Sequence, residues 1–159
     1  MLTVAELERY DRQIMLREIG EAGQEKLKTA SVFIAGAGGL GSPVAIYLTA
    51  AGIGRIRLVD HDRVDRTNLN RQVLHWDNDI GRSKVESATE KLKKLNPEVE
   101  IEAIKETITE ANLAQLLAGF DLIVDAMDNL PTRYLLNKAA LDQNTPFFTG
   151  QFMDLKAEQ

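Results

Sequence analysis

Two kinds of hydrophobic pattern alternate along the chain. Short apolar runs rich in β-branched residues predict buried strands, over residues 31–35, 55–60, 99–104, 120–126 and 146–150. Apolar residues at helical spacing and helix-capping signals predict helices between them, over residues 40–51, 84–95, 109–119 and 131–143. Such alternation implies right-handed crossovers. It therefore predicts an α/β fold: a Rossmann-like, doubly wound, mainly parallel sheet with helices on both faces.

The two ends of the predicted domain differ. Residues 1–30 predict an N-terminal helical segment, because Leu7, Tyr10, Ile14 and Leu16 recur at roughly helical spacing. Residues 151–159 follow the fifth strand without a closing helix. Since a free sheet edge is normally paired or covered, we expect residues 1–159 to form a single domain that lacks its C-terminal part or is completed by a partner.

Local signals also predict the start of one helix. Ser83 and Glu86 have the spacing of a capping box at the beginning of helix 84–95. The residues Asn96-Pro97 then predict its end.

Composition narrows the possible functions. The 159 residues carry a net charge of -5, which argues against a nucleic-acid-binding surface. No cysteine occurs, so the chain has no disulfide framework, thiolate zinc site or cysteine nucleophile. The N-terminus lacks a secretory signal, and no apolar run approaches the ~20 residues needed to span a bilayer. We therefore expect a cytoplasmic protein with no membrane partner.

A glycine-rich loop follows the first predicted strand. Gly36, Gly38 and Gly41 satisfy G-x-G-x-x-G, and Gly39 adds a further glycine. Such glycines let the backbone approach a phosphate at the N-terminus of the next helix. Asp60 ends the second strand, where a carboxylate can accept hydrogen bonds from ribose hydroxyls. Taken alone, the loop and Asp60 favour NAD.

Polar residues after the second strand favour a triphosphate instead. Asn68, Arg71 and Gln72 follow that strand at the predicted ligand-facing edge of the sheet. An arginine offers a rigid donor fork for phosphoryl oxygens. Lys84 lies in the first turn of the helix that follows and places a compact positive charge at the same edge.

A carboxylate after the fourth strand predicts a metal site. Asp128 is placed to hold Mg²⁺, which commonly uses one or two carboxylates together with waters and phosphate oxygens. Asp125 lies at the strand end, and its role stays open between ligand binding and structure.

The other polar and aromatic residues near these motifs have structural interpretations. Thr132 and Arg133 are expected to cap and solvate the following helix. His61 and His75 have no partner at metal-ligand spacing, so we interpret both as turn residues. Trp76 is expected to be a packing anchor.

The motifs occur in an order that carries a resemblance. The set comprises G-x-G-G-L-G, L-V-D-x-D, N-L-N-R-Q, G-R-S-K-V and D-x-x-D-N, preceded by R-Y-D-R-Q at residues 9–13. Over residues 9–151 the chain resembles the adenylation domain of the ThiF/MoeB/HesA family, which is related to ubiquitin-activating enzymes. The resemblance implies ATP- and Mg²⁺-dependent adenylation of the C-terminal Gly-Gly carboxylate of a small ubiquitin-like sulfur-carrier protein, with release of pyrophosphate.

The resemblance also implies a role for individual residues. By this resemblance, Gly38, Gly39 and Asp60 would bind the nucleotide, with Asp60 in contact with the ribose. Phosphate binding falls to Asn68, Arg71 and Lys84, and magnesium binding to Asp128. Arg12 resembles an arginine that reaches across a homodimer interface into the neighbouring subunit's site.

Alternatives remain open at this stage. Many members of this family have further Cys-x-x-Cys zinc motifs or a catalytic cysteine beyond the region that this sequence covers. The carrier could belong to the thiamine or the molybdopterin pathway, and a related branch acts on a modified adenosine of tRNA. The chain could also be an inactive nucleotide-binding module or fragment, or, less favoured, an NAD-dependent oxidoreductase.

Overall fold

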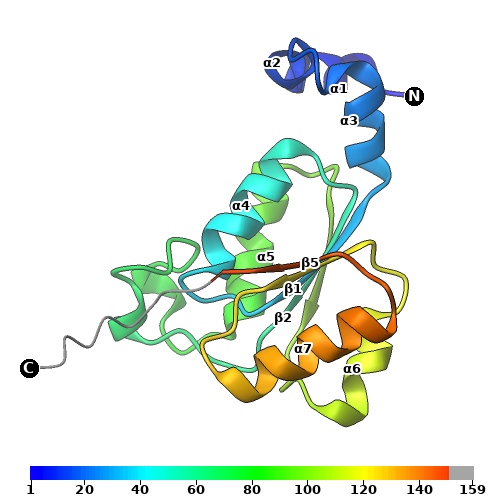
Figure 1. Ribbon diagram of the computed structural model, residues 1–159. Helices are drawn as coiled ribbons and strands as arrows, with labels where there is room; N and C mark the ends of the chain where they lie inside the picture. The colour runs from blue at the N-terminus through cyan, green and yellow to red at the C-terminus, as the bar shows by residue number, and fades with distance from the viewer. Residues whose placement is uncertain (151–159) are drawn as a thin grey trace, which may run out of the picture.

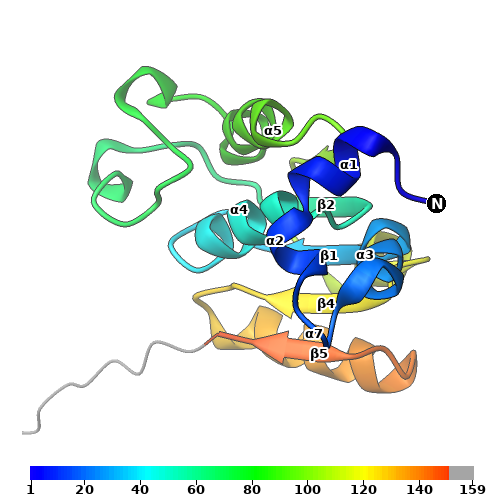
Figure 2. The ribbon, with the colours of Figure 1, turned by 90° about the horizontal axis from the view of Figure 1, so that it is seen from above.

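The computed structural model describes residues 1–150 and contains a five-stranded, fully parallel sheet. The strands lie side by side in the order β3-β2-β1-β4-β5, as Figure 2 shows for four of them from above. Their bounds are β1 (Ser31–Ala35), β2 (Arg55–Val59), β3 (Glu100–Ile104), β4 (Leu122–Asp125) and β5 (Phe147–Thr149). The parallel order confirms the predicted fold class.

Helices cover both faces of the sheet (Figure 1). One face carries α4 (Gly41–Ala51) and α5 (Lys84–Leu95), and the other carries α6 (Glu110–Leu117) and α7 (Leu130–Asp142). Two short 3-10 helices, η1 (Arg66–Asn68) and η2 (Asp77–Asp79), lie in the long connection between β2 and α5. None of the helices in residues 1–150 combines the length and apolarity required to cross a bilayer.

The central strand β1 shows how the sequence divides the core. All five of its residues are buried. Because successive side chains of a strand point to opposite faces, Val32 and Ile34 pack with the apolar residues of α4 and α5, while Phe33 and Ala35 pack with those of α6 and α7. Burial on both faces explains why β1 is apolar without alternation.

The N-terminal helical segment folds as three short helices. They are α1 (Val4–Arg9), α2 (Asp11–Ile14) and α3 (Gly20–Thr29), which gather at one end of the molecule (Figure 1). Tyr10 is buried, and its hydroxyl accepts a hydrogen bond of 2.8 Å from Asn96 Nδ2. Gln13 Nε2 donates to the Ala51 carbonyl at the end of α4. Buried contacts therefore fix this segment to the domain.

A buried carboxylate in α1 makes stability depend on pH. The hydrogen bond from Lys28, together with those from Thr3, lowers the pKa of Glu6 from 4.5 to about 2. Because this pKa is lower in the folded state, Glu6 stabilises the fold above the unfolded-state pKa, and this stabilisation is lost as pH falls from about 4.5 towards 2. Between about pH 4.5 and 2, we expect the unfolding free energy of the wild-type protein to fall by roughly 2 kcal/mol more than that of the Glu6→Gln variant. Denaturant titrations at a series of pH values measure this, and parallel losses in both proteins would contradict it.

Two sequence predictions near α5 are wrong. Ser83 makes no capping hydrogen bond, and its buried Oγ has no partner within residues 1–150. The first N–H of the helix, that of Lys84, donates instead to the Asp62 carbonyl. Trp76 is 60% exposed, so it does not anchor the core, and its ring instead lies 4.6 Å from Lys91 Nζ. Both residues belong to the connection between β2 and α5, whose course depends on distant contacts.

Candidate functional site

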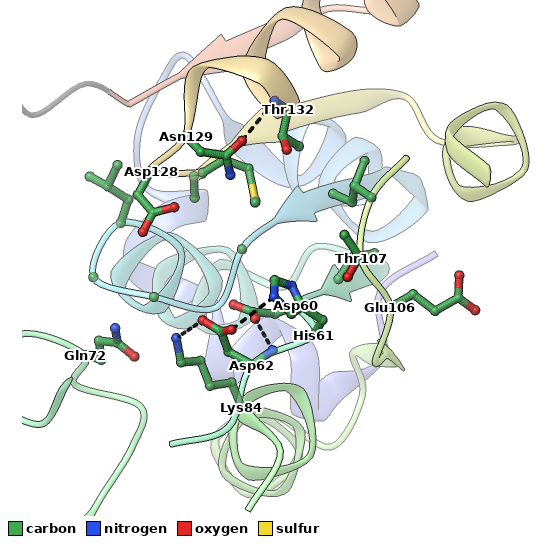
Figure 3. Close-up of a pocket in the computed structure, with 18 of the residues that line it drawn as sticks. Asp60, His61, Asp62, Gln72, Lys84, Glu106, Thr107, Asp128, Asn129 and Thr132 are labelled. Carbon is green, nitrogen blue, oxygen red and sulfur yellow. Dashed lines mark hydrogen bonds and ion pairs between the residues drawn. The ribbon is translucent and has the colours of Figure 1, made fainter. Parts of the chain in front are cut away.

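A pocket of about 300 Å³ lies at the carboxyl ends of β1, β2 and β4 (Figure 3). The chain runs from β1 to β2 on one side and reaches β4 on the other, so this is the topological switch point of the sheet. The lining includes most of the predicted residues, namely Gly36, Gly38, Gly39, Asp60, Arg71, Gln72, Lys84 and Asp128. Gly41, Asn68 and Arg12 are predicted site residues that do not line it.

The glycines of the loop serve two different purposes. Gly36 has φ +98°, and a Cβ there would lie 2.8 Å from the Ala126 carbonyl oxygen. A Cβ on Gly41 would lie 1.8 Å from the Gly36 carbonyl oxygen, so this glycine allows the loop and α4 to touch. At Gly38 and Gly39 the nearest atoms would be 3.5 Å or more away. These two glycines leave the backbone open to the pocket.

The start of α4 offers unpaired donors. Among residues 1–150, the N–H groups of Gly38, Gly39 and Leu40 donate to no backbone or side-chain acceptor. Such groups, with the positive end of the helix dipole, bind anions. Gln72 lies beside Gly38 with its side chain buried, and its Oε1 has no hydrogen-bond partner within residues 1–150. These groups are suited to a phosphorylated ligand.

Asp60 supports the loop. Its Oδ2 accepts from the Ala37 N–H, and its Oδ1 accepts from the Asp62 N–H, both at 2.8 Å. Asp60 is half-buried and also lines the pocket. The carboxylate therefore connects the end of β2 to the glycine loop, and its contact with a ribose stays a prediction.

Lys84 is buried and forms an ion pair with Asp62, a residue that was not predicted to belong to the site. Its Nζ donates to Asp62 Oδ2 at 2.8 Å, and this bond lowers the pKa of Asp62 (Figure 3). Asp62 is the second aspartate of L-V-D-x-D, a signal that could have identified it. Asp60, His61 and Asp62 each offer one atom that could ligate a metal ion, and these three atoms lie within 4.8 Å of one another. His61 is exposed beside the pocket, which it also lines.

Arg71 and Asn68 have different positions. Arg71 is exposed and lines the pocket, while its Nη1 donates to the Thr67 carbonyl at 2.9 Å. The Asn68 Oδ1 accepts from the Asp65 N–H at 3.1 Å, which completes the capping box at the start of η1. Arg71 is thus available to a ligand through its remaining donors, whereas the Asn68 carboxamide oxygen is used locally.

The opposite wall follows β4. Asp128 is exposed, and Asn129 caps α7 by accepting from the Thr132 N–H at 3.0 Å. Both Asn129 and Thr132 line the pocket, and Figure 3 shows them with Asp128 across from Lys84. The residue that caps α7 is therefore Asn129, and Thr132 only supplies the N–H group that donates to this cap.

Asp125 is structural. It is buried, and its Oδ2 accepts from Arg133 Nε and from Thr149 Oγ1, each at 2.8 Å. The expectation that Arg133 is solvated is wrong, because its side chain is bound between β4 and β5 through these contacts.

A predicted residue on α2 lies outside the pocket, and a segment that was not predicted lines it. Arg12 is exposed on α2 and is not part of its own chain's pocket. Glu106, Thr107 and Ile108 line the pocket but were not predicted. They follow β3, so their position at a strand end was the signal available.

Three comparisons place these observations among known proteins. The model of the ThiF family matches residues 10–158. The chain is 49% identical over 148 residues to the sulfur carrier protein adenylyltransferase of Thermus thermophilus, covering 93% of this chain and 55% of that protein. It is 48% identical over 153 residues to the adenylyltransferase and sulfurtransferase MOCS3 of Anopheles gambiae, covering 96% of this chain and 35% of that one.

Solved structures agree with the sequence comparison. The E. coli tRNA N6-threonylcarbamoyladenosine dehydratase TcdA in complex with ATP superposes with a TM-score of 0.89 at 29% identity, covering 96% of this chain and 65% of that one. E. coli MccB with ATP gives 0.83 at 32% identity, covering 91% and 45%. The chain thus spans only part of the length of these relatives. The family match over nearly all of its residues and the shared fold show that it belongs to the ThiF family.

Proposed function

We propose that the chain is the nucleotide-binding part of an enzyme that uses ATP and Mg²⁺ to adenylate the C-terminal Gly-Gly carboxylate of a small ubiquitin-like sulfur-carrier protein. The observation that carries this proposal is that one pocket brings together complementary groups. One wall has the N–H groups before α4 that lack an acceptor in residues 1–150, together with the side chains of Lys84 and Arg71, and Asp128 lies opposite. The names of the Thermus thermophilus and Anopheles gambiae relatives support the activity, and the ATP complexes of TcdA and MccB support the nucleotide.

The chemistry requires no activated side-chain nucleophile. A carboxylate is already ionised at neutral pH, and in the proposed reaction its oxygen attacks the α-phosphorus while the bond to pyrophosphate breaks. The residues of this chain would orient the triphosphate and neutralise the charge that moves to the leaving group. Lys84 would exchange its bond with Asp62 for one with a phosphate oxygen. Arg71 would offer its free donors to the same group.

The charge of the pocket supports a divalent cation. Its lining carries the carboxylates of Asp60, Asp62, Glu106 and Asp128 but only the cations of Arg71 and Lys84. A triphosphate therefore needs further positive charge. We propose that Asp128 holds Mg²⁺, which supplies that charge when bound; its exposed carboxylate fits the preference of Mg²⁺ for few protein ligands and several waters.

The central experiment is ATP–pyrophosphate exchange with purified protein and a Gly-Gly-tailed carrier. Exchange that depends on the carrier supports adenylation. ATP binding without exchange would favour an inactive nucleotide-binding module. Binding of NADH in preference to ATP would favour an oxidoreductase, for which Arg71, Lys84 and Asp128 have no evident use. Carriers of the thiamine and molybdopterin pathways and a modified tRNA, tested in parallel, distinguish the substrates.

Arg12 provides a test of a shared site in a homodimer. We expect Arg12→Ala and Asp128→Ala to be almost inactive separately, and a mixture to regain up to about a quarter of wild-type activity, because half of the dimers are mixed and one of their two sites is intact. Pyrophosphate exchange measures the recovery. Mixtures of Arg71→Ala with Asp128→Ala are the control, since those residues line the same pocket and leave no intact site. No recovery in dimers shown to exchange subunits would contradict the shared site.

A further inference from the structure

A chain of buried hydrogen bonds leads from α5 to the glycine loop. His75, interpreted from sequence as a turn residue, is only 3% exposed. Its Nε2 lies 2.9 Å from the Ala37 carbonyl oxygen, and its Nδ1 lies 3.0 Å from Ser87 Oγ. Lys91 Nζ donates to Ser87 Oγ at 2.9 Å and also to the Asp79 carboxylate. His75 therefore connects this helix to a loop 38 residues earlier in the chain.

The chemistry of these groups sets the direction of each hydrogen bond. A carbonyl oxygen can only accept, so the proton of the neutral ring lies on Nε2 and is donated to Ala37. Nδ1 then accepts from the Ser87 hydroxyl, whose oxygen accepts from Lys91. Burial lowers the pKa of His75, and the charges of Lys91 and Lys84 lower it further against the opposing effects of the Ala37 carbonyl and Asp79. Both the burial of the ring and the hydrogen bond to the Ala37 carbonyl fit a neutral imidazole with its proton on Nε2.

The same contacts orient the peptide between Ala37 and Gly38. The Ala37 N–H donates to Asp60, and its carbonyl accepts from His75 and, at 3.2 Å, from Ser42 Oγ. In a planar trans peptide the C=O and the following N–H point in opposite directions. Holding the Ala37 carbonyl towards the buried ring therefore turns the Gly38 N–H away from it. Gly38 lines the pocket, and this N–H has no acceptor in residues 1–150.

We infer that His75 is a positioning residue, which holds the Gly38 N–H towards the pocket so that it can donate to a phosphate of the bound nucleotide. This inference rests on the proposed function, since it requires a phosphorylated ligand in the pocket. His75 itself does not line the pocket, so it acts on the ligand through the backbone of the loop.

The test compares two ligands that differ only in their phosphates. Calorimetry measures the binding of ATP and of adenosine to wild type, His75→Phe and His75→Gln. His75→Phe keeps a planar ring without a donor, and we expect it to weaken ATP binding by about tenfold or more while changing adenosine binding less than about twofold. His75→Gln restores an N–H donor and should recover most of the ATP affinity. Equal losses for both ligands, or unchanged ATP binding in a folded His75→Phe protein, would overturn the inference.

A second measurement keeps the inference testable if His75→Phe does not fold. Nitrogen-15 NMR of the wild-type imidazole should show a neutral ring with the proton on Nε2, and the Gly38 amide resonance should shift with ATP but not with adenosine. A ring proton on Nδ1, or a Gly38 amide resonance that does not shift when ATP binds, would overturn the inference. Wild type that binds ATP without carrier-dependent pyrophosphate exchange would contradict adenylation alone and leave the His75 comparison valid.

Discussion

Lys84→Ala is expected to lower the rate of ATP–pyrophosphate exchange by at least ~100-fold, the effect typical of removing one donor that stabilises transition-state charge. The side chain is buried in the pocket wall, where its ammonium has few water molecules to compete with. Its partner Asp62 is exposed, so the variant does not bury an unpaired carboxylate. The loss should therefore appear in the reaction rather than in folding.

Lys93→Ala is the matched control for this prediction. Lys93 lies on the same helix, α5, but is exposed and does not line the pocket. The control should exchange pyrophosphate at the wild-type rate, and both variants should retain the wild-type thermal midpoint within a few degrees. If Lys84→Ala exchanges as fast as Lys93→Ala, Lys84 does not neutralise the triphosphate.

Gly41→Ala is expected to lower the unfolding free energy by at least ~3 kcal/mol, or to prevent folding, because overpacking against backbone has no inexpensive relief. Its Cβ would lie 1.8 Å from the Gly36 carbonyl oxygen, which belongs to the backbone of the glycine loop and cannot rotate away as a side chain would. Denaturant unfolding followed by circular dichroism measures the change.

Gly38→Ala separates packing from ligand binding in the same loop. A Cβ at Gly38 would meet only Gln72 side-chain atoms, the nearest at 3.6 Å, which is ordinary contact. We expect near wild-type stability but weaker ATP binding, because Gly38 lines the pocket. Similar stability losses in Gly38→Ala and Gly41→Ala would show that the loop does not divide its glycines between these two purposes.

The fold could be predicted because its signals are local. A strand such as β1 is apolar at every position, and α4 begins two residues before a proline that helices tolerate only in their first turn. Glycines and polar residues at strand ends also indicated the pocket, since parallel strands bring those ends to one edge. The strand order could not be derived from these local patterns.

The residues misjudged from sequence all depend on distant partners. His75 looked like a turn residue because Ala37, which it contacts, is 38 positions away. Arg133 looked solvated because its position in α7 does not reveal Asp125 at the end of β4. Ser83 has the residue type and spacing of a cap but makes no capping bond, and the start of the helix is attached to Asp62, 22 residues earlier, through the Lys84 N–H and side chain. Capping and burial of this kind are decided by tertiary contacts.

The way the N-terminal segment is fixed has a consequence for enzyme kinetics. Tyr10 and Gln13 are held at the end of α4 near Ala51, whereas the glycine loop lies at the other end of this 11-residue helix. At 1.5 Å per residue the helix is about 16 Å long, so it keeps Arg12 away from the pocket of its own chain. If Arg12 serves a nucleotide, each active unit contains two chains. Specific activity should then fall on dilution, and a kinetic trace started from dilute protein should accelerate as subunits associate.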